Sequence, residues 1–449
     1  MVTTVTCDRF ITRLFIKLLN LQTRIVELGY SNTAFIESIK DFKYYKILIK
    51  SWRISRKMIT FASAKMKGVI WNMKNSIIKH IVCQCLCVLA ATHCLAQGLP
   101  TDGPLTVPPM LQQLGERLLK GKQGSIVAIK PQTGEIICLA TNSANGYDVN
   151  MAIGKAYPPG STFKTAQALT LLTEGVVVPE TTVECKNGFT DGNIHVGCHQ
   201  HASPLALTSA LAVSCNTWFI TGFMAMINDT FMYENKEEAI TTWNRHMRSL
   251  GMGGPLGIDI PGEKGGLLAN VGYLNRRYKD GWDGKTILWA GMGQGDITAT
   301  PMQLCNLAAV IANRGYFYTP HIHQATDERP LSQRYLTRHE TTISADAFKT
   351  VVSGMRRAVT NGTATAINTS YPICGKTGTA ENSGRDHSAF IGFAPMDNPQ
   401  IAISVYIEHG GFGADVAAPM AALIIEEYLK GELSKTSEEK AKRLSSLRF

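Results

Sequence analysis

The sequence predicts an α+β fold, in which the two ends of one domain supply a single antiparallel sheet and helices pack against it. The first observation behind this prediction is a pair of β-forming runs at each end, at residues 124–141 and 388–410. The second is the series of longer apolar stretches between them, which are typical of helices. The third is size, because 449 residues with 45% hydrophobic content are enough to bury a large core.

The elements at the start of the domain are a helix, a hairpin and a second helix. Leu111–Leu119 is predicted to be helical, and "GSIVAIKPQTGEIICLAT" divides into two strands around Pro131–Gly134. Thr162–Thr173 is predicted to be a helix that ends before Gly175, because glycine commonly follows the last helical turn.

The rest of the domain is predicted to be helical and then to return to the sheet. Apolar stretches predict three helices, at Leu205–Val213, Trp218–Ile227 and Met302–Asn313. "SAFIGFAPMDNPQIAISVYIEHG" predicts two strands joined at Asp397-Asn398-Pro399, and a helix near Ala417–Leu429 follows them.

Four segments are expected along the chain. Residues 1–72 form a basic extension that we expect not to be native, with Met73 as the natural start. Residues 73–96 have lysines, an apolar stretch and the small-residue ending Cys94-Leu95-Ala96, the layout of a secretory signal. The apolar run is short for a membrane span, and both a cleaved signal and an uncleaved anchor stay open. Residues 97–430 form the domain, and residues 431–449 form a charged tail that we expect to be frayed.

The charge of the chain indicates membrane targeting rather than nucleic-acid binding. The formal net charge is +10, and part of it lies in residues 1–80 among apolar residues. A basic patch interleaved with aromatic residues would indicate nucleic-acid binding, and the sequence has none. We therefore expect no nucleic-acid partner.

The stretch "AYPPGSTFKTAQALTLLTEG" places Ser161 and Lys164 at the start of an apolar helix. Serine is a weak nucleophile unless a neighbouring base takes its proton, and residues three apart share one helix face. Burial among apolar residues would keep the lysine neutral, so that it can act as that base. The alternative is a helix cap followed by a lysine whose stem lies along the apolar surface.

Two further motifs could complete such a site. Ser214-Cys215-Asn216 lies between two predicted helices, where a hydroxyl can relay a proton and an amide can orient a substrate, or where the three residues simply form a capped turn. Lys376-Thr377-Gly378-Thr379 lies on a predicted strand. Its ammonium and hydroxyl groups suit a substrate carboxylate, and the glycine lets a substrate backbone lie close.

Two glycine-rich stretches exclude nucleotide binding through the usual motifs. A phosphate-binding loop ending at Gly375-Lys376-Thr377 would need glycine at position 370, which is Ser370. "GMGQGD" at residues 291–296 does not match the dinucleotide fingerprint, because its last position is Asp296.

These motifs, together with "YPPGSTFK", "SCNTWF", "GMGQGDITATPMQL", "NRGYFYTPHI", "NGTA" and "CGKTGTAEN", resemble the transpeptidase domain of class B penicillin-binding proteins. The similarity extends from Leu111 to Leu429 and is strongest to the elongation type, penicillin-binding protein 2, of Bacteroidetes-like bacteria. It implies the fold shared by penicillin-binding transpeptidases and serine β-lactamases.

The resemblance implies a peptidoglycan D,D-transpeptidase that is acylated by β-lactams. Ser161 would attack the D-Ala-D-Ala carbonyl of a stem peptide, with Lys164 as the base and with Ser214 and Asn216 assisting. The β-strand motif, with Lys376, Thr377 and Thr379, would bind the terminal carboxylate, and the backbone N–H groups of Ser161 and Thr379 would form the oxyanion hole. Two rival functions remain: a serine β-lactamase, and a penicillin-binding sensor without catalytic turnover.

A set of soft ligands lies next to the second motif, at Cys185, Cys198, His201 and Cys215. Three cysteines and one histidine suit tetrahedral zinc, and the resemblance also implies a zinc ion in this region. A Cys185–Cys198 disulfide is the competing interpretation, and Cys215 as a small packing residue is a third. We expect no organic cofactor.

The resemblance also implies a location and partners. The protein would act on the periplasmic side of the bacterial inner membrane, anchored or secreted through residues 73–96. Its ligands would be stem peptides and β-lactams.

The family usually carries a non-catalytic pedestal that contacts a membrane glycan polymerase. Only a short segment separates Ala96 from Leu111 here, so we expect no pedestal, and the sequence gives that partner little support.

Overall fold

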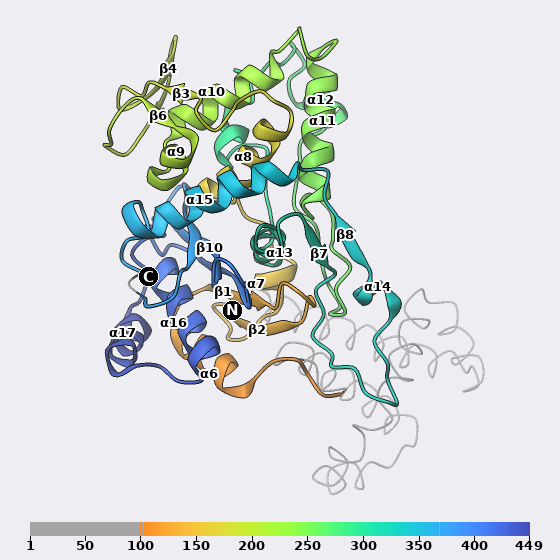
Figure 1. Cartoon of the computed structure of the whole chain (residues 1–449), viewed down its shortest axis with the longest axis vertical. Helices are drawn as coiled ribbons and strands as arrows, with labels where there is room; N and C mark the ends of the chain where they lie inside the picture. Colours follow the sequence, from red (N-terminus) through yellow and green to blue (C-terminus); the bar gives the residue numbers. More distant parts are fainter. Residues whose placement is uncertain (1–98, 100–102, 368) are drawn as a thin grey trace, which may run out of the picture. The chain divides into compact units, whose positions relative to one another are not determined.

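A computed structural model describes Leu99, residues 103–367 and residues 369–449 (Figure 1). The predicted basic extension, residues 1–72, and the predicted signal or anchor, residues 73–96, lie outside the described residues. Within the described part of the chain, no helix combines the length and the apolar character that crossing a membrane requires.

The centre of the fold is one antiparallel sheet of five strands in the order β2-β1-β11-β10-β9. Its strands are β1 (Gly124–Ile129), β2 (Ile136–Asn142), β9 (Cys374–Ala380), β10 (His387–Ala394) and β11 (Ile401–Ile407). Strand β1 pairs with β11, so that Gly124 lies opposite Ile407 and Ile129 opposite Ala402. The two ends of the domain therefore form one sheet, as the sequence predicts.

Helices cover both faces of this sheet (Figure 1). Alternate residues of a strand point to opposite faces, and the odd-numbered residues of β11 pack with α6 (Pro109–Leu119) and α16 (Ala417–Lys430). The other face contacts α13 (Pro301–Ala312), whose residues are all buried. Because both faces are covered, the central strands are apolar on both sides.

The charged segment 431–449 forms a packed helix, so the expected frayed tail is wrong. Ser434 caps α17 (Lys435–Ser446) by accepting a hydrogen bond from the backbone N–H of Ser437. Ala441 and Leu444, three residues apart on one face, are buried with α6 and α16. Arg117 also donates two hydrogen bonds, of 2.8 and 2.9 Å, to the carboxylate of Glu438. A narrow apolar face is enough to hold this otherwise polar helix on the domain.

The remaining elements lie mainly between the two sheet-forming ends of the chain. The helices are α7 (Asn150–Ile153), η1 (Gly160–Phe163), α8 (Lys164–Thr173), α9 (Leu207–Val213), α10 (Asn216–Ile227), α11 (Lys236–Ser249), α12 (Val271–Arg277), η2 (Leu288–Met292), α14 (Gln333–Leu336) and α15 (Ala345–Asn361). Three two-stranded sheets pair β3 (Thr182–Val183) with β6 (Leu205–Ala206), β4 (Gly188–Asp191) with β5 (Ile194–Gly197), and β7 (Tyr316–Tyr318) with β8 (Arg338–Glu340).

Candidate active site

Ser161 lies in a short 3₁₀ turn, η1, that leads directly into α8. The sequence predicts a single helix from Thr162, and the structure differs in that its first turn is the tighter 3₁₀ form. Gly160 has φ 54°, and a Cβ atom there would lie 2.6 Å from the backbone oxygen of Thr379. Glycine therefore lets the nucleophile's turn touch strand β9, with the backbone of Gly160, the residue before Ser161, against that of Thr379.

Lys164 is the first residue of α8 and is fully buried. Its Nζ donates hydrogen bonds to Ser214 O at 2.8 Å, to Ser214 Oγ at 3.3 Å and to Asn216 Oδ1 at 2.5 Å. Burial lowers the pKa of Lys164 from 10.5 to about 8, against the opposing charges of Cys198 and Cys215. A lysine with this pKa is neutral in about one tenth of molecules at pH 7, and the neutral form can accept a proton.

The second motif lies between α9 and α10, as the sequence predicts. Ser214 ends α9 in a left-handed conformation, with φ 61°, and Asn216 is the first residue of α10. Cys215 caps α10, and its Sγ accepts a hydrogen bond from the backbone N–H of Trp218. The left-handed residue turns the chain sharply, so that the side chains of Ser214 and Asn216 both reach Lys164.

The third motif lies on β9, the edge strand of the sheet. Lys376 is fully buried, and its Nζ donates a 3.0 Å hydrogen bond to Thr377 O. Burial, together with the charge of Lys164, lowers the pKa of Lys376. The space beside Gly378 is filled by Thr162, whose Cγ2 would lie 2.8 Å from a Cβ atom there. This glycine lets β9 pack closely against the nucleophile's turn.

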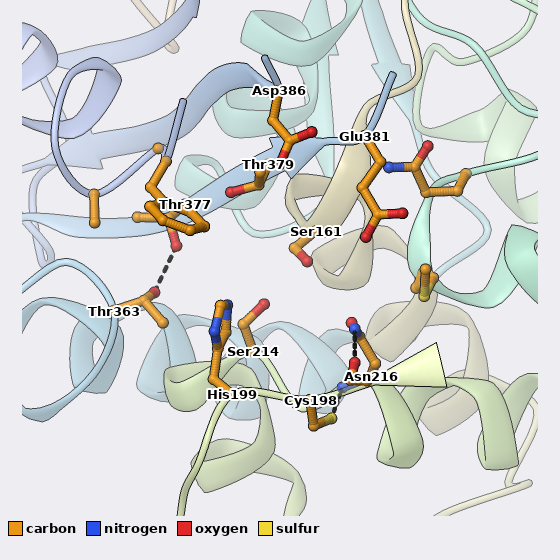
Figure 2. A pocket seen from close by; sticks show the side chains of 16 residues that line it. Ser161, Cys198, His199, Ser214, Asn216, Thr363, Thr377, Thr379, Glu381 and Asp386 are labelled. Carbon is orange, nitrogen blue, oxygen red and sulfur yellow. Dashed lines mark hydrogen bonds between the residues drawn. The ribbon is translucent and has the colours of Figure 1, made fainter. Parts of the chain in front are cut away.

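The three motifs meet at one cavity of about 530 Å³. Figure 2 shows Ser161 between the β9 threonines, Thr377 and Thr379, on one side and Ser214 and Asn216 on the other. Lys164 and Lys376 are buried rather than exposed in this cavity.

Other lining residues were not predicted from the sequence; they include Gln294, Thr363, His199, Glu381, Asp386 and Phe412. Three of them lie in or beside recognisable stretches. Gln294 is within "GMGQGD", Thr363 is within "NGTA", and Glu381 is within "CGKTGTAEN", directly after strand β9. Thr363 contacts the site through a 2.5 Å hydrogen bond between its hydroxyl and that of Thr377.

The sequence profile of the penicillin binding protein transpeptidase domain matches residues 124–426. The chain belongs to this family. A relative, the peptidoglycan D,D-transpeptidase MrdA of Acinetobacter baumannii, is 30% identical over 69% of this chain and 52% of its own length. The chain spans about half the length of the curated relatives it matches.

Solved structures of the transpeptidase family share this fold. One is Pseudomonas aeruginosa PBP2 in complex with WCK 5153, which is 29% identical with a TM-score of 0.64, over 74% of this chain and 77% of the other. Another comes from a peptidoglycan synthase complex that coordinates polymerization and crosslinking; it is 27% identical with a TM-score of 0.64, over 74% and 63% of the two chains. The predicted penicillin-binding transpeptidase fold is confirmed.

The four predicted metal ligands of this transpeptidase domain lie together beside the second motif. The ligand atoms of Cys185, Cys198, His201 and Cys215 all lie within 4.8 Å of one another. The Sγ atoms of Cys198 and Cys215 are 3.8 Å apart, close to the distance of about 3.8 Å between two sulfur ligands of tetrahedral zinc. All three cysteines are free thiols in the structure.

The surroundings of the cluster also suit a metal. His201 Nε2 is buried without a hydrogen-bond partner in the described part of the chain, whereas its Nδ1 lies 2.7 Å from Ala202 O. A backbone contact at one ring nitrogen fixes the tautomer and leaves the other nitrogen free to bind a metal. A hydrogen bond with the Cys215 thiol lowers the pKa of Cys198, which favours a thiolate at this position.

Proposed function

We propose that this chain is a serine D,D-transpeptidase that cross-links peptidoglycan stem peptides through an acyl-enzyme on Ser161, and that β-lactams acylate the same serine. The observation that carries the proposal is the cavity in which Ser161 faces Ser214, Asn216 and the β9 threonines. Three residues after its nucleophile comes a fully buried lysine of lowered pKa, and such a pair suits acyl transfer.

The first half-reaction forms the ester. Ser161 Oγ attacks the carbonyl of the penultimate D-Ala, and its proton passes to neutral Lys164. The backbone N–H groups of Ser161 and Thr379 stabilise the oxyanion. Ser214, which contacts Lys164 Nζ, relays the proton to the leaving amine, so that terminal D-Ala departs as the peptide C–N bond breaks.

The second half-reaction forms the cross-link. An amine of a neighbouring stem attacks the ester carbonyl and loses a proton to the same lysine. The lysine returns this proton to Ser161 Oγ as the bond between Oγ and the acyl carbon breaks. The hydroxyl groups of Thr377 and Thr379 hold the donor's terminal carboxylate before the first step. Lys376 donates a hydrogen bond to Thr377 O, so its role is to position this strand.

The test is labelling with a fluorescent penicillin, followed by mass spectrometry of the peptide that contains Ser161. A lasting adduct on Ser161 that is absent from Ser161→Ala supports the proposal, and an adduct elsewhere contradicts it. Rapid release of the label would instead show a β-lactamase. A D-Ala-D-Ala donor supplied with an amine acceptor then gives a cross-linked product with a transpeptidase and none with a sensor.

We also propose that Cys185, Cys198, His201 and Cys215 hold a structural zinc ion. The compact donor set supports this proposal, and so does the buried His201 Nε2, which has no hydrogen-bond partner among the described residues. Four protein ligands leave no open position, so the role would be structural. Cys215 lies between Ser214 and Asn216, and a metal on it would tie the second motif to the segment that carries Cys185, Cys198 and His201.

Metal analysis of protein purified without a chelator tests the zinc site. We expect about one zinc per chain and a loss of zinc in Cys185→Ser. Cys138→Ala is the matched control, because Cys138 is also a buried free thiol but lies on β2. A zinc content far below one per chain, or an equal loss in both variants, would rule the site out.

We further propose that the domain acts on the periplasmic side of the inner membrane and is anchored or secreted through residues 73–96. The proposed substrate supports this location, because stem peptides are cross-linked outside the cytoplasm. A solved relative in a peptidoglycan synthase complex supports a glycan polymerase as a partner. Fractionation of cells that express the full chain tests the location, and co-purification with a glycan polymerase tests the partner.

A further inference from the structure

A glycine-rich turn at residues 293–295 lies directly against the turn that carries Ser161. Gly293 O accepts a 2.9 Å hydrogen bond from the backbone N–H of Gly160. A Cβ atom at Gly293 would lie 2.2 Å from Gly160 O, so the two backbones touch. The next residue, Gln294, lines the cavity together with Ser161. Any movement of this turn would therefore change both the nucleophile's support and the cavity wall.

Asp296 connects this turn to helix α12. Its Oδ1 accepts a 2.9 Å hydrogen bond from the hydroxyl of Tyr273, and its Oδ2 accepts a 2.8 Å hydrogen bond from the hydroxyl of Tyr278. Arg277 Nε lies 3.0 Å from Oδ1 of the same carboxylate. The side chain of Asp296 is only 10% exposed, but that of Arg277 is 54% exposed. Water weakens the arginine contact, and the two tyrosine hydroxyls between them hold both carboxylate oxygens.

The turn needs such an attachment because its own backbone is permissive. Gly293 and Gly295 both have left-handed conformations, with φ 81° and 70°, and glycine populates many other conformations at little cost. The segment after Asp296 is fixed by backbone pairing, since Ile297 bridges Leu268 and Ala299 bridges Tyr157. The side-chain hydrogen bonds of Asp296 fix one more residue before this paired segment, and so bring the fixed region closer to Gln294 and Gly293.

We propose that Asp296, through Tyr273 and Tyr278, is a positioning residue that holds the 293–295 turn against Gly160 and so keeps Ser161 in the arrangement that acylation needs. The inference rests on the proposed function. It also gives a role to Asp296 in "GMGQGD", the residue that makes this stretch differ from the dinucleotide-binding fingerprint. Asp296 itself does not line the active-site cavity and acts through Gly293 and Gln294.

The test compares Asp296→Ala, Asp296→Asn and the double variant Tyr273→Phe/Tyr278→Phe. The matched control is Asp259→Ala, because Asp259 is similarly buried, with its side chain 11% exposed, and accepts backbone hydrogen bonds of 2.8 and 3.0 Å at residues 322 and 323. Asp259 does not line the active-site cavity. Three quantities are measured with a fluorescent penicillin and a thermal melt: the acylation rate constant at saturation, the half-saturating concentration and the melting temperature.

We expect Asp296→Ala and the double tyrosine variant to lower the acylation rate constant by about 10-fold or more, since small displacements of reacting groups cost this much. Asp296→Asn should restore most of the rate, because its amide can both accept from and donate to the tyrosine hydroxyls. Asp259→Ala should lower the melting temperature and leave the rate constant unchanged.

Two results would overturn the inference. One is an Asp296→Ala variant that is acylated at the wild-type rate. The other is a rate loss in Asp296→Ala no larger than that in Asp259→Ala at a similar melting temperature. Absence of label on wild-type Ser161 would refute the proposed function and this inference with it, whereas a labelled wild type and a normal Asp296→Ala would refute this inference alone.

Discussion

The pH dependence of Ser161 acylation follows from the burial of Lys164. With a pKa of about 8, the neutral fraction of this lysine is about one tenth at pH 7, about half at pH 8 and about nine tenths at pH 9. Because only the neutral amine can take the serine proton, we expect the acylation rate constant to rise about 10-fold from pH 7 to pH 9 and then to level off. Stopped-flow measurement with a fluorescent penicillin at saturation checks this profile.

The same burial predicts a change in stability. A lowering from 10.5 to about 8 corresponds to about 3 kcal/mol. Between these two values the unfolded chain binds the proton that the folded chain lacks, so the free energy of unfolding should rise with pH across this window. Lys164→Met removes the titrating group, and its free energy of unfolding should rise by about 3 kcal/mol less than that of the wild type over the same window.

Two outcomes would refute this reasoning. A rate that climbs about 10-fold per pH unit up to about pH 10 would show a lysine with its ordinary pKa. A rate that falls between pH 7 and pH 9 would show that the ammonium form is needed. Ser161→Ala gives the background of the acylation assay, and urea unfolding of the wild type and Lys164→Met at each pH supplies the stability difference.

Three further predictions concern other parts of the domain. Ser214→Ala should lower the acylation rate by about 100-fold, measured with the same penicillin, because the proton relay is lost; an unchanged rate would contradict the relay. Gly160→Ala should lower the free energy of unfolding in urea by about 1–2 kcal/mol and abolish penicillin labelling of Ser161, because alanine is strained at positive φ and its Cβ would meet Thr379 O. Full labelling of this variant would show that the turn can move. Leu444→Ala should lower the free energy of unfolding by about 2–5 kcal/mol in the same assay and leave the acylation rate unchanged. An unchanged free energy of unfolding would show that α17 does not pack on the domain.

The sequence predicts the sheet and the chemical motifs well because both depend on local patterns. Paired β-forming runs identify β1 with β2 and β10 with β11, and the short motifs identify Ser161, Ser214 and the β9 threonines. The structure brings these motifs to one cavity, although they are spread over more than two hundred residues of the sequence. The family resemblance supplies that long-range information, which periodicity alone does not contain.

Other parts of the site are not predicted because they depend on loops and on single side chains. His199 and Phe412 reach the cavity from loops far apart in the sequence, and neither lies in a motif with its own chemistry. The charged composition of α17 conceals the two residues, Ala441 and Leu444, that hold it on the domain. The sequence places Lys164 beside Ser161, but in the structure the Lys164 ammonium donates its hydrogen bonds to Ser214 and Asn216.

The pairing of β1 with β11 has a consequence for how the domain is made. Residues 124–129 find their partner only when residues 402–407 are available, and contacts this distant in the chain close slowly. Strand β9, which carries the threonines of the cavity, joins β1 only through β10 and β11. We therefore expect a chain that stops before residue 401 to leave β1 and β10 with unpaired edges, and an N-terminal fragment to gain penicillin binding only when the missing C-terminal piece is added in trans.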